Sequence, residues 1–213
     1  TRFGPDGNPR KTGDNINSVW IFMSGGTTVS NTGIINVNET LSVGVYSAEK
    51  GNLFINQASG IINVDNGGIG VIVKGGAIAE NNGTINLGGT INTAGESIGM
   101  AGYSGSTIVN NTSGVINVTE GIGMYVATGA MLENKGTISI LNGTGIFGDG
   151  QIVNHGNIYI LPGGTGDLIS DGTVISTGSI KIDKNGNVTI NDKLHVLGGT
   201  ITVDGTLVLN GVF

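Results

Sequence analysis

Residues 129–160 read GAMLENKGTISILNGTGIFGDGQIVNHGNIYI, and this stretch contains one pattern twice. Residues 132–136 (LENKG) precede 137–140 (TISI), and residues 152–156 (IVNHG) precede 157–160 (NIYI). The shared rule is apolar-x-Asn-x-Gly, followed by a short segment whose apolar residues are two positions apart. This pattern predicts a turn followed by a short β-strand.

The alternation gives each short strand two different faces. Because successive strand side chains point to opposite sides, Ile138 and Ile140 share one face, and Thr137 and Ser139 share the other. One short strand cannot bury its apolar face alone, so a neighbouring copy must cover it. Self-similarity at a period of about 20–50 residues is typical of repeat architectures.

The strand pattern Gly-x-apolar-x-apolar occurs eight times along the chain. Its copies begin at Gly33, Gly60, Gly83, Gly114, Gly136, Gly156, Gly178 and Gly199, at intervals of 27, 23, 31, 22, 20, 22 and 21 residues. A second recurring strand lies between copies, at 43–46, 69–72, 98–101, 122–125 and 145–147. A third short strand precedes the Asn-x-Gly turn, as at 77–79, 107–109 and 151–153.

These intervals favour one fold. They are too long for two-residue hairpins and too short for crossover helices, and no segment has a helical period with caps. We therefore predict an all-β fold, a right-handed parallel β-helix of about eight coils of 20–31 residues with three short strands each. Ile116, Ile138, Ile158 and Ile180 share one strand phase and are expected to stack as an inward ladder. The repeated glycines are expected where the backbone must bend with little side-chain bulk or with positive φ.

The two ends of the chain depart from the regular repeat. Residues 1–18 lack it and are predicted to form an irregular N-terminal loop or insertion, while 19–213 are predicted to be a β-helix segment truncated at both ends. Toward the C-terminus, Gly186 and Gly205 carry the same strand pattern between the regular copies. Trp20, the single tryptophan, is interpreted as covering an exposed end or packing under the loop, with a carbohydrate-stacking platform as the alternative.

The composition excludes several classes of protein. Charged residues make up 11% of the chain, against roughly a quarter in typical soluble proteins, and 41 residues are glycine. The net charge is −6, so the chain does not have the positive charge with which proteins bind nucleic acid. It also contains no basic amphipathic segment that would bind a membrane surface. The absence of cysteine excludes disulfides and thiolate metal sites. No apolar run approaches the ~18 residues of a transmembrane helix.

Asparagines recur beside the glycines that open the strands. Since Asn hydrogen-bonds the backbone in turns, stacked copies are expected to form an amide ladder that satisfies buried turn groups. The expected members are Asn31, Asn81, Asn111, Asn134 and Asn154.

No residue combination indicates a catalytic, cofactor-binding or metal site. Residues 163–167 (GGTGD) nearly match a calcium-binding β-roll repeat, but the Asp is one position early and no tandem copy follows. His155 and His195 have no His or carboxylate at metal-ligand spacing. Glu80 and Glu133 share a repeat phase but lack a further Asp or Arg, so the paired carboxylates of a β-helical hydrolase or lyase are not indicated. No catalytic, cofactor or metal residue is nominated, and the binding residues are unknown.

The Asn-x-Gly-x-Ile-x-Val coils, the Ile-Gly-Met-Tyr strand at 122–125, the absence of Cys and the low charge resemble the passenger domains of type V autotransporters. Over about residues 29–210 the chain is similar in particular to large fusobacterial-type surface adhesins, with two-partner secreted haemagglutinin-like adhesins as the next candidates. This resemblance implies export through a C-terminal outer-membrane β-barrel outside this segment, and display on the surface of a Gram-negative bacterium.

The resulting functional hypothesis is a structural and adhesive one. We expect a monomeric, non-enzymatic, rigid β-helical stalk that presents a binding surface to a host-cell protein or glycan, or to partner bacteria, with no nucleic acid, small-molecule substrate or cofactor. Two alternatives remain open: a carbohydrate-active β-helix enzyme, and a pure spacer whose parent protein binds elsewhere.

Overall fold

The computed structural model describes residues 18–88, 96–162 and 164, and then 174–176, 179–182, 187–190, 194–196, 200–204 and 206–209. In these residues the chain is all β, and every strand pairing is parallel. Each strand pairs with its counterpart one repeat later. The predicted parallel β-helix is confirmed.

Three long sheets run along the solenoid. Sheet 1 contains β1 (Ser18–Met23), β4 (Ser42–Ser47), β7 (Ile69–Val73), β10 (Ile98–Gly102), β13 (Ile122–Val126) and β16 (Thr144–Phe147). Sheet 2 contains β2 (Thr28–Asn31), β5 (Leu53–Asn56), β8 (Ile78–Asn81), β11 (Thr107–Asn110), β14 (Met131–Asn134), β17 (Gln151–Asn154), β19 (Val174–Ser176) and β22 (Leu194–Val196). Sheet 3 contains β3 (Ile34–Val37), β6 (Ile61–Val64), β9 (Thr84–Leu87), β12 (Val115–Val118), β15 (Thr137–Ile140), β18 (Asn157–Ile160), β20 (Ser179–Ile182) and β23 (Thr200–Val203).

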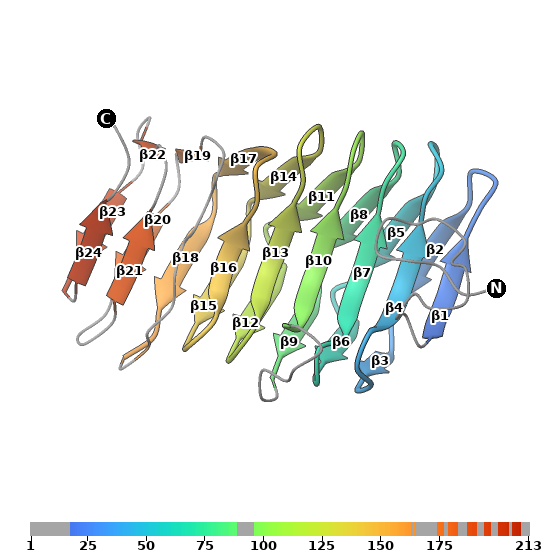
Figure 1. The fold of residues 1–213 in the computed structure, drawn as a ribbon, viewed down its shortest axis with the longest axis horizontal. Helices are drawn as coiled ribbons and strands as arrows, with labels where there is room; N and C mark the ends of the chain where they lie inside the picture. Colours follow the sequence, from blue (N-terminus) through green and yellow to red (C-terminus); the bar gives the residue numbers. More distant parts are fainter. Residues whose placement is uncertain are drawn as a thin grey trace.

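One coil is one pass of the chain through sheets 1, 2 and 3. Six coils are complete in the described residues: coil 1 consists of β1, β2 and β3, and coil 6 consists of β16, β17 and β18. Sheets 2 and 3 each continue to eight strands, in agreement with the eight predicted copies. The strands expected after Gly186 and Gly205 are β21 (Asn187–Ile190) and β24 (Thr206–Leu209), which pair with each other. Figure 1 shows the coils stacked in chain order, with β1 and β24 at opposite ends of the solenoid.

The core is built from columns of identical or similar side chains. The predicted isoleucine ladder is present, because Ile116, Ile138, Ile158 and Ile180 are successive Cα partners in sheet 3. The side chains of Ile116, Ile138 and Ile158 are at most 1% exposed. Thr137 on the opposite face of the same strand is only partly buried. The in–out assignment made from the alternation is therefore confirmed.

The glycines are required by the close approach of neighbouring coils. A Cβ atom at Gly136 would lie 2.2 Å from the carbonyl oxygen of Gly114, and one at Gly156 would lie 2.2 Å from that of Gly136. In sheet 1, a Cβ at Gly99 would lie 2.5 Å from the carbonyl oxygen of Gly123. Gly99, Gly136 and Gly156 do not have a positive φ, so small bulk is the reason at these strand positions.

A buried asparagine ladder lies at the corner between sheets 2 and 3. Each side-chain Nδ2 donates to the Oδ1 of the asparagine in the next coil, at 2.7–2.8 Å. Its members are Asn31, Asn56, Asn81, Asn110, Asn134 and Asn154. The predicted ladder therefore exists with one wrong member and one missing member: Asn110 takes the place expected for Asn111, and Asn56 was not predicted.

Sheet 1 is apolar on both faces over coils 2 to 4. Val45 faces the main core, whereas Val43, Tyr46, Ile72 and Ala101 form a separate cluster with 0% exposure on the opposite face. Parallel sheets covered on both faces have such continuous apolar strands. The outer face of sheet 1 thus carries a second cluster of buried apolar side chains, separate from the main core.

Candidate functional site

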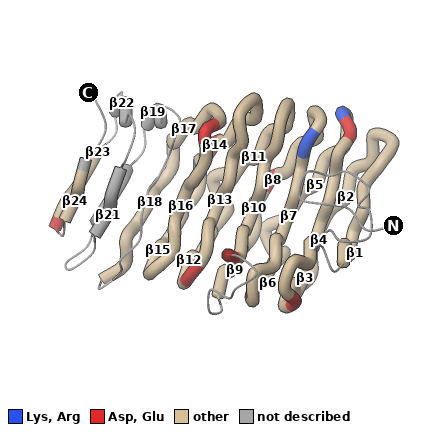
Figure 2. The backbone as a smooth tube through the Cα atoms, viewed as in Figure 1, with Lys and Arg blue, Asp and Glu red and all other residues tan. Residues whose placement is uncertain are grey.

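The charged groups form no dense cluster. Figure 2 shows the described Asp, Glu, Lys and Arg positions spread along the solenoid, mostly in turns. No group of three or more His, Asp or Glu side chains in the described part of the chain could hold a metal ion. Within the same residues, no helix is long and apolar enough to cross a membrane.

Glu80 and Glu133 share one outward column of sheet 2, as predicted, with Val109 between them. They are therefore two coils apart. Glu80 accepts a hydrogen bond from Asn111 Nδ2 at 3.2 Å. These two carboxylates are held by different neighbours, and the structure does not bring them into one pair.

The Glu133 carboxylate is part of a small surface ion group. Lys135 Nζ lies 2.9 Å from Glu133 Oε2, and His155 Nε2 lies 3.7 Å from Glu133 Oε1. The expectation that His155 stands apart from carboxylates is therefore wrong, because the coil brings residue 155 beside residue 133. One histidine and one carboxylate remain too few donors for a metal site.

The other residues singled out from the sequence do not gather at one place. Trp20 lies on β1, at the first strand of sheet 1, and is 64% exposed. It lies on the first strand of the described solenoid with its side chain largely exposed, so the structure does not decide between its two interpretations. The side chain of His195, residues 1–17 and all but one of residues 163–167 lie outside the described residues.

One candidate site is a groove at the corner where the chain passes from sheet 1 to sheet 2. The corner turns of coils 3 to 6 (74–77, 103–106, 127–130 and 148–150) stack on one another. Backbone hydrogen bonds join them across coils: Gly75 N–H donates to Ser104 O at 2.9 Å, and Gly105 N–H donates to Gly129 O at 2.8 Å. This bonding makes the corner a continuous ridge. Two hollows lie beside this ridge, one over sheet 1 and one over sheet 2, and we call them together the corner groove.

The side of the corner groove over sheet 1 is aromatic. Tyr125 is the Cα partner of Phe147 in the next coil, and their ring centroids are 5.9 Å apart. Tyr103, in the coil before, lies 5.6 Å from Tyr125 at an interplanar angle of 50°. All three rings are partly buried. They form a short aromatic row along the solenoid axis.

Polar groups lie at the edge of this row. A hollow of about 570 Å³ is lined by Lys74, Gly75, Tyr103, Ser104, Tyr125, Ala127, Thr128 and Asp149. The rings of Tyr103 and Tyr125 thus face the same space as two hydroxyl groups, one ammonium group and one carboxylate. An apolar floor with a few convergent polar groups is the usual composition of a ligand site.

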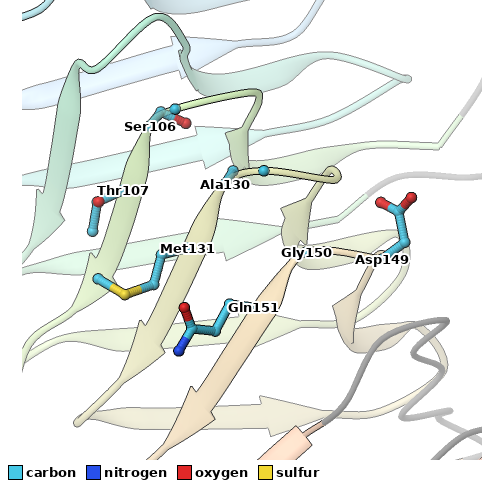
Figure 3. Close-up of a pocket in the computed structure, with 9 residues that line it drawn as sticks. Ser106, Thr107, Ala130, Met131, Asp149, Gly150 and Gln151 are labelled. Carbon is cyan, nitrogen blue, oxygen red and sulfur yellow. The ribbon is translucent and has the colours of Figure 1, made fainter.

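The side of the groove over sheet 2 is smaller and has no aromatic side chain in its lining. Its hollow of about 370 Å³ is lined by Gly105, Ser106, Thr107, Gly129, Ala130, Met131, Asp149, Gly150 and Gln151. Figure 3 shows Thr107, Met131 and Gln151 side by side on three neighbouring strands, with Asp149 on the turn beside them. The small residues of the turns leave the hollow open.

Asp149 belongs to both sides of the corner groove. The Thr128 hydroxyl donates a hydrogen bond to Asp149 Oδ2. This bond is the main reason why the pKa of the Asp149 carboxyl is lowered from 3.8, and backbone hydrogen bonds act in the same direction. Asp149 is solvent-exposed and ionised at neutral pH, so its carboxylate can accept hydrogen bonds from a ligand.

The sequence did not predict this site. Tyr125 and Phe147 were assigned to the second strand of their coils, but their stacking depends on the register of β13 and β16. Tyr103 follows β10 and reaches Tyr125 diagonally across the strands. A signal was available at Tyr125 and Phe147, which occupy corresponding positions of neighbouring coils, whereas Tyr103 lies two residues beyond that position.

A second polar surface lies on the outer face of sheet 3. Asn63 Nδ2 donates to Asn36 Oδ1 at 2.8 Å, Asn86 donates to Asn63 at 3.0 Å, and Asn117 donates to Asn86 at 2.9 Å. This outer asparagine row borders a hollow of about 530 Å³. It contains no aromatic side chain.

Comparison with known proteins gives one family. A family model described as the BigA third pectate lyase-like domain matches residues 41–114, which are about a third of the chain and lie within coils 2 to 4. No curated protein and no solved structure matches significantly. The matched region is similar to a β-helical domain of BigA, and it ends before Tyr125, Phe147 and Asp149.

Proposed function

We propose that this chain is a structural and adhesive segment of a bacterial surface adhesin, of the type V autotransporter kind. It forms a rigid β-helical stalk at the outer surface of a Gram-negative cell and presents a binding surface to host cells or to other bacteria. The similarity to a domain of BigA, an autotransporter-like adhesin, is the observation that carries this proposal.

The fold supports a stalk. Each coil adds one layer of about 4.8 Å to the long axis, and its core residues contact mainly the coils on either side. Columns such as Ile116–Ile138–Ile158 remain in register through the solenoid. A continuous core of this kind holds any surface site in a fixed orientation, which lowers the entropy cost of binding.

The outer surface supports adhesion through polar contacts rather than through charge. Amide and hydroxyl groups predominate on it, as in the outer asparagine row. Only 11% of the residues are charged. Such a surface favours uncharged polar ligands, which can exchange hydrogen bonds with amides and hydroxyls.

The proposal is tested by coating beads with the purified chain and measuring their attachment to human epithelial cells and to a panel of oral and intestinal bacteria. Attachment above that of beads coated with the heat-unfolded chain is expected. Attachment no better than this control would contradict an adhesive role and leave the spacer alternative.

The family description contains the word lyase, but it describes a fold, and no carboxylate pair of the described residues supports that chemistry. We expect no cleavage of polygalacturonate or other acidic polysaccharides by the purified chain. Release of unsaturated or reducing sugars that stops on replacement of Glu80 or Glu133 would show an enzyme instead.

A further inference from the structure

We infer that the corner groove binds a short, neutral oligosaccharide lying along the solenoid axis. This inference rests on the proposed adhesive function and names the ligand class and the residues. It starts from Tyr103, Tyr125 and Phe147, which are the only row of three aromatic side chains in contact among the described residues.

The aromatic row supplies the apolar part of the site. A sugar ring has a face of C–H groups, which packs on the face of an aromatic ring, and hydroxyl groups around its edge. Partly buried Tyr and Phe side chains offer such a face at a low entropy cost, since their rotamers are already restricted. The neighbouring rings hold Tyr125 from both sides, at 5.6 and 5.9 Å.

The edge of the groove supplies the polar part. Ser104, Thr128 and Asp149 lie beside the rings in the same hollow. Since the Asp149 carboxylate is ionised and accepts only, it suits ligand hydroxyl groups, which donate. Charge-assisted hydrogen bonds of this kind fix orientation and discriminate between sugars.

The charges in the groove favour a neutral ligand. Lys74 and Asp149 carry opposite charges at the two ends of the hollow, because Lys74 is in coil 3 and Asp149 is in coil 6. The chain as a whole has a net charge of −6, which repels sialylated and sulfated glycans. Lys74 also disfavours a cationic ligand, the other class that rings beside a carboxylate attract.

The length of the groove fits more than one sugar unit. Coils 3 and 6 are three layers apart, or ~14 Å at ~4.8 Å for each layer. Tyr103 and Tyr125 line the hollow in coils 4 and 5, so successive sugar units can stack on successive rings. The backbone bonds between the corner turns keep these positions fixed before the ligand arrives.

The test is an array of neutral, sialylated and sulfated oligosaccharides probed with the whole chain, followed by titration of the best neutral ligand. Tyr125→Ala is expected to weaken binding about tenfold or more, which corresponds to ~1.4 kcal/mol. Tyr125→Phe, which keeps the ring, should bind like the unchanged chain. Asp149→Asn should weaken binding severalfold, and circular dichroism spectra should be the same for all variants.

Trp20→Ala is the matched control. It removes the most exposed aromatic side chain of the same sheet, but from coil 1, outside the groove. It should leave glycan binding unchanged. A loss with Trp20→Ala that equals the loss with Tyr125→Ala would place the site at the end of the solenoid and overturn the inference.

Two further results would overturn it. One is binding of tetramethylammonium or choline, but of no neutral glycan, in a manner that depends on Tyr125. The other is a chain that binds no glycan on the array and attaches to cells equally well before and after the substitution Tyr125→Ala. In this second case the adhesive function stands and only the groove is wrong, whereas a chain that binds glycans but no cells contradicts the adhesive function alone.

Discussion

Two rows of stacked asparagines run along the solenoid, one buried at the corner of sheets 2 and 3 and one exposed on the outer face of sheet 3. In the buried ladder each Nδ2 donates toward the C-terminal coil, as from Asn110 to Asn134. In the outer row each Nδ2 donates toward the N-terminal coil, as from Asn86 to Asn63. The asparagine side chains of the two rows therefore donate their hydrogen bonds in opposite directions along the solenoid.

The reason lies in what else each amide contacts. The buried Asn110 Nδ2 also donates to the carbonyl oxygen of Gly114 at 3.3 Å, and Asn56 Nδ2 donates to that of Gly60 at 3.2 Å. These turn carbonyls determine which way the buried amides face. The outer amides lie against water and are bonded chiefly to each other, so their removal exposes no buried group. Burial, and not the hydrogen-bond distance, should therefore decide what each row contributes to stability.

The largest difference is expected when a charge is introduced into each row. Asn110→Asp places a carboxylate that cannot donate against the oxygens of Asn134, Gly114 and Thr137. At pH 7 we expect a loss of ~3–5 kcal/mol in the free energy of unfolding. Because burial raises the pKa of the new carboxyl, part of this loss should be recovered as the pH is lowered toward 4. Urea denaturation at both pH values measures it.

Asn86→Asp is the matched control in the outer row, where Asn86 is only partly buried. It should change the free energy of unfolding by no more than about 0.5 kcal/mol. Equal losses from Asn86→Asp and Asn110→Asp would contradict the assignment of one row to the interior.

The isoleucine ladder provides a second comparison of inside with outside. Ile138→Ala should leave a cavity between Ile116 and Ile158 and cost ~2–5 kcal/mol. Thr137→Ala, on the outward face of the same strand, should stay within about 0.5 kcal/mol. Urea denaturation of both variants measures the difference, and a greater loss at Thr137 would reverse the in–out assignment of the whole sheet.

Deleting an amide should cost less than charging it. Asn110→Ala removes the donor to Asn134 and Gly114 and leaves buried carbonyl groups without it, so a loss of ~1–3 kcal/mol is expected. Asn86→Ala should have an effect within about 0.5 kcal/mol, because water replaces the lost bonds. Thermal unfolding followed by circular dichroism compares the two, and indistinguishable melting temperatures would refute the proposed role of burial.

The smallest effect on stability is expected at the fully exposed pair of the corner groove. Thr128→Ala removes the hydrogen bond that chiefly lowers the Asp149 pKa, so that pKa should rise toward 3.8. Because the pKa of Asp149 is lower in the folded chain, its carboxylate stabilises the fold at pH values above the pKa of the unfolded chain. This contribution is lost as the pH falls through the pKa of the folded chain. It is small because the group is exposed to solvent. Titration by NMR measures the pKa, and an unchanged pKa would show that another group lowers it.

The sequence alone predicted the coil, because every layer of a parallel β-helix needs the same alternation of apolar residues and the same small residues at its turns. The alternation in 137–140 placed Ile138 inside and Thr137 outside, and the spacing of glycines set the register of sheet 3. These features depend on the two-residue period of a strand and on side-chain size, and both can be read directly from the residue types and their spacing.

The members of the buried ladder could be predicted only in part. The interval between the ladder asparagine and the strand-opening glycine is two residues at Asn134–Gly136, but four at Asn56–Gly60 and Asn110–Gly114. The prediction named Asn111, which is one residue closer to Gly114 than the true member Asn110. The ladder position is set by the end of the sheet 2 strand, and the turn absorbs the two extra residues.

The sequence by itself thus determined the fold, the core columns and the existence of an asparagine ladder, since each follows from a repeated local pattern. Only the tertiary structure decided which asparagine joins that ladder, brought His155 to Glu133, and assembled Tyr103, Tyr125 and Asp149 into one groove. These contacts join residues about 20 or more positions apart. They depend on how turns of unequal length align neighbouring coils, which no local pattern specifies.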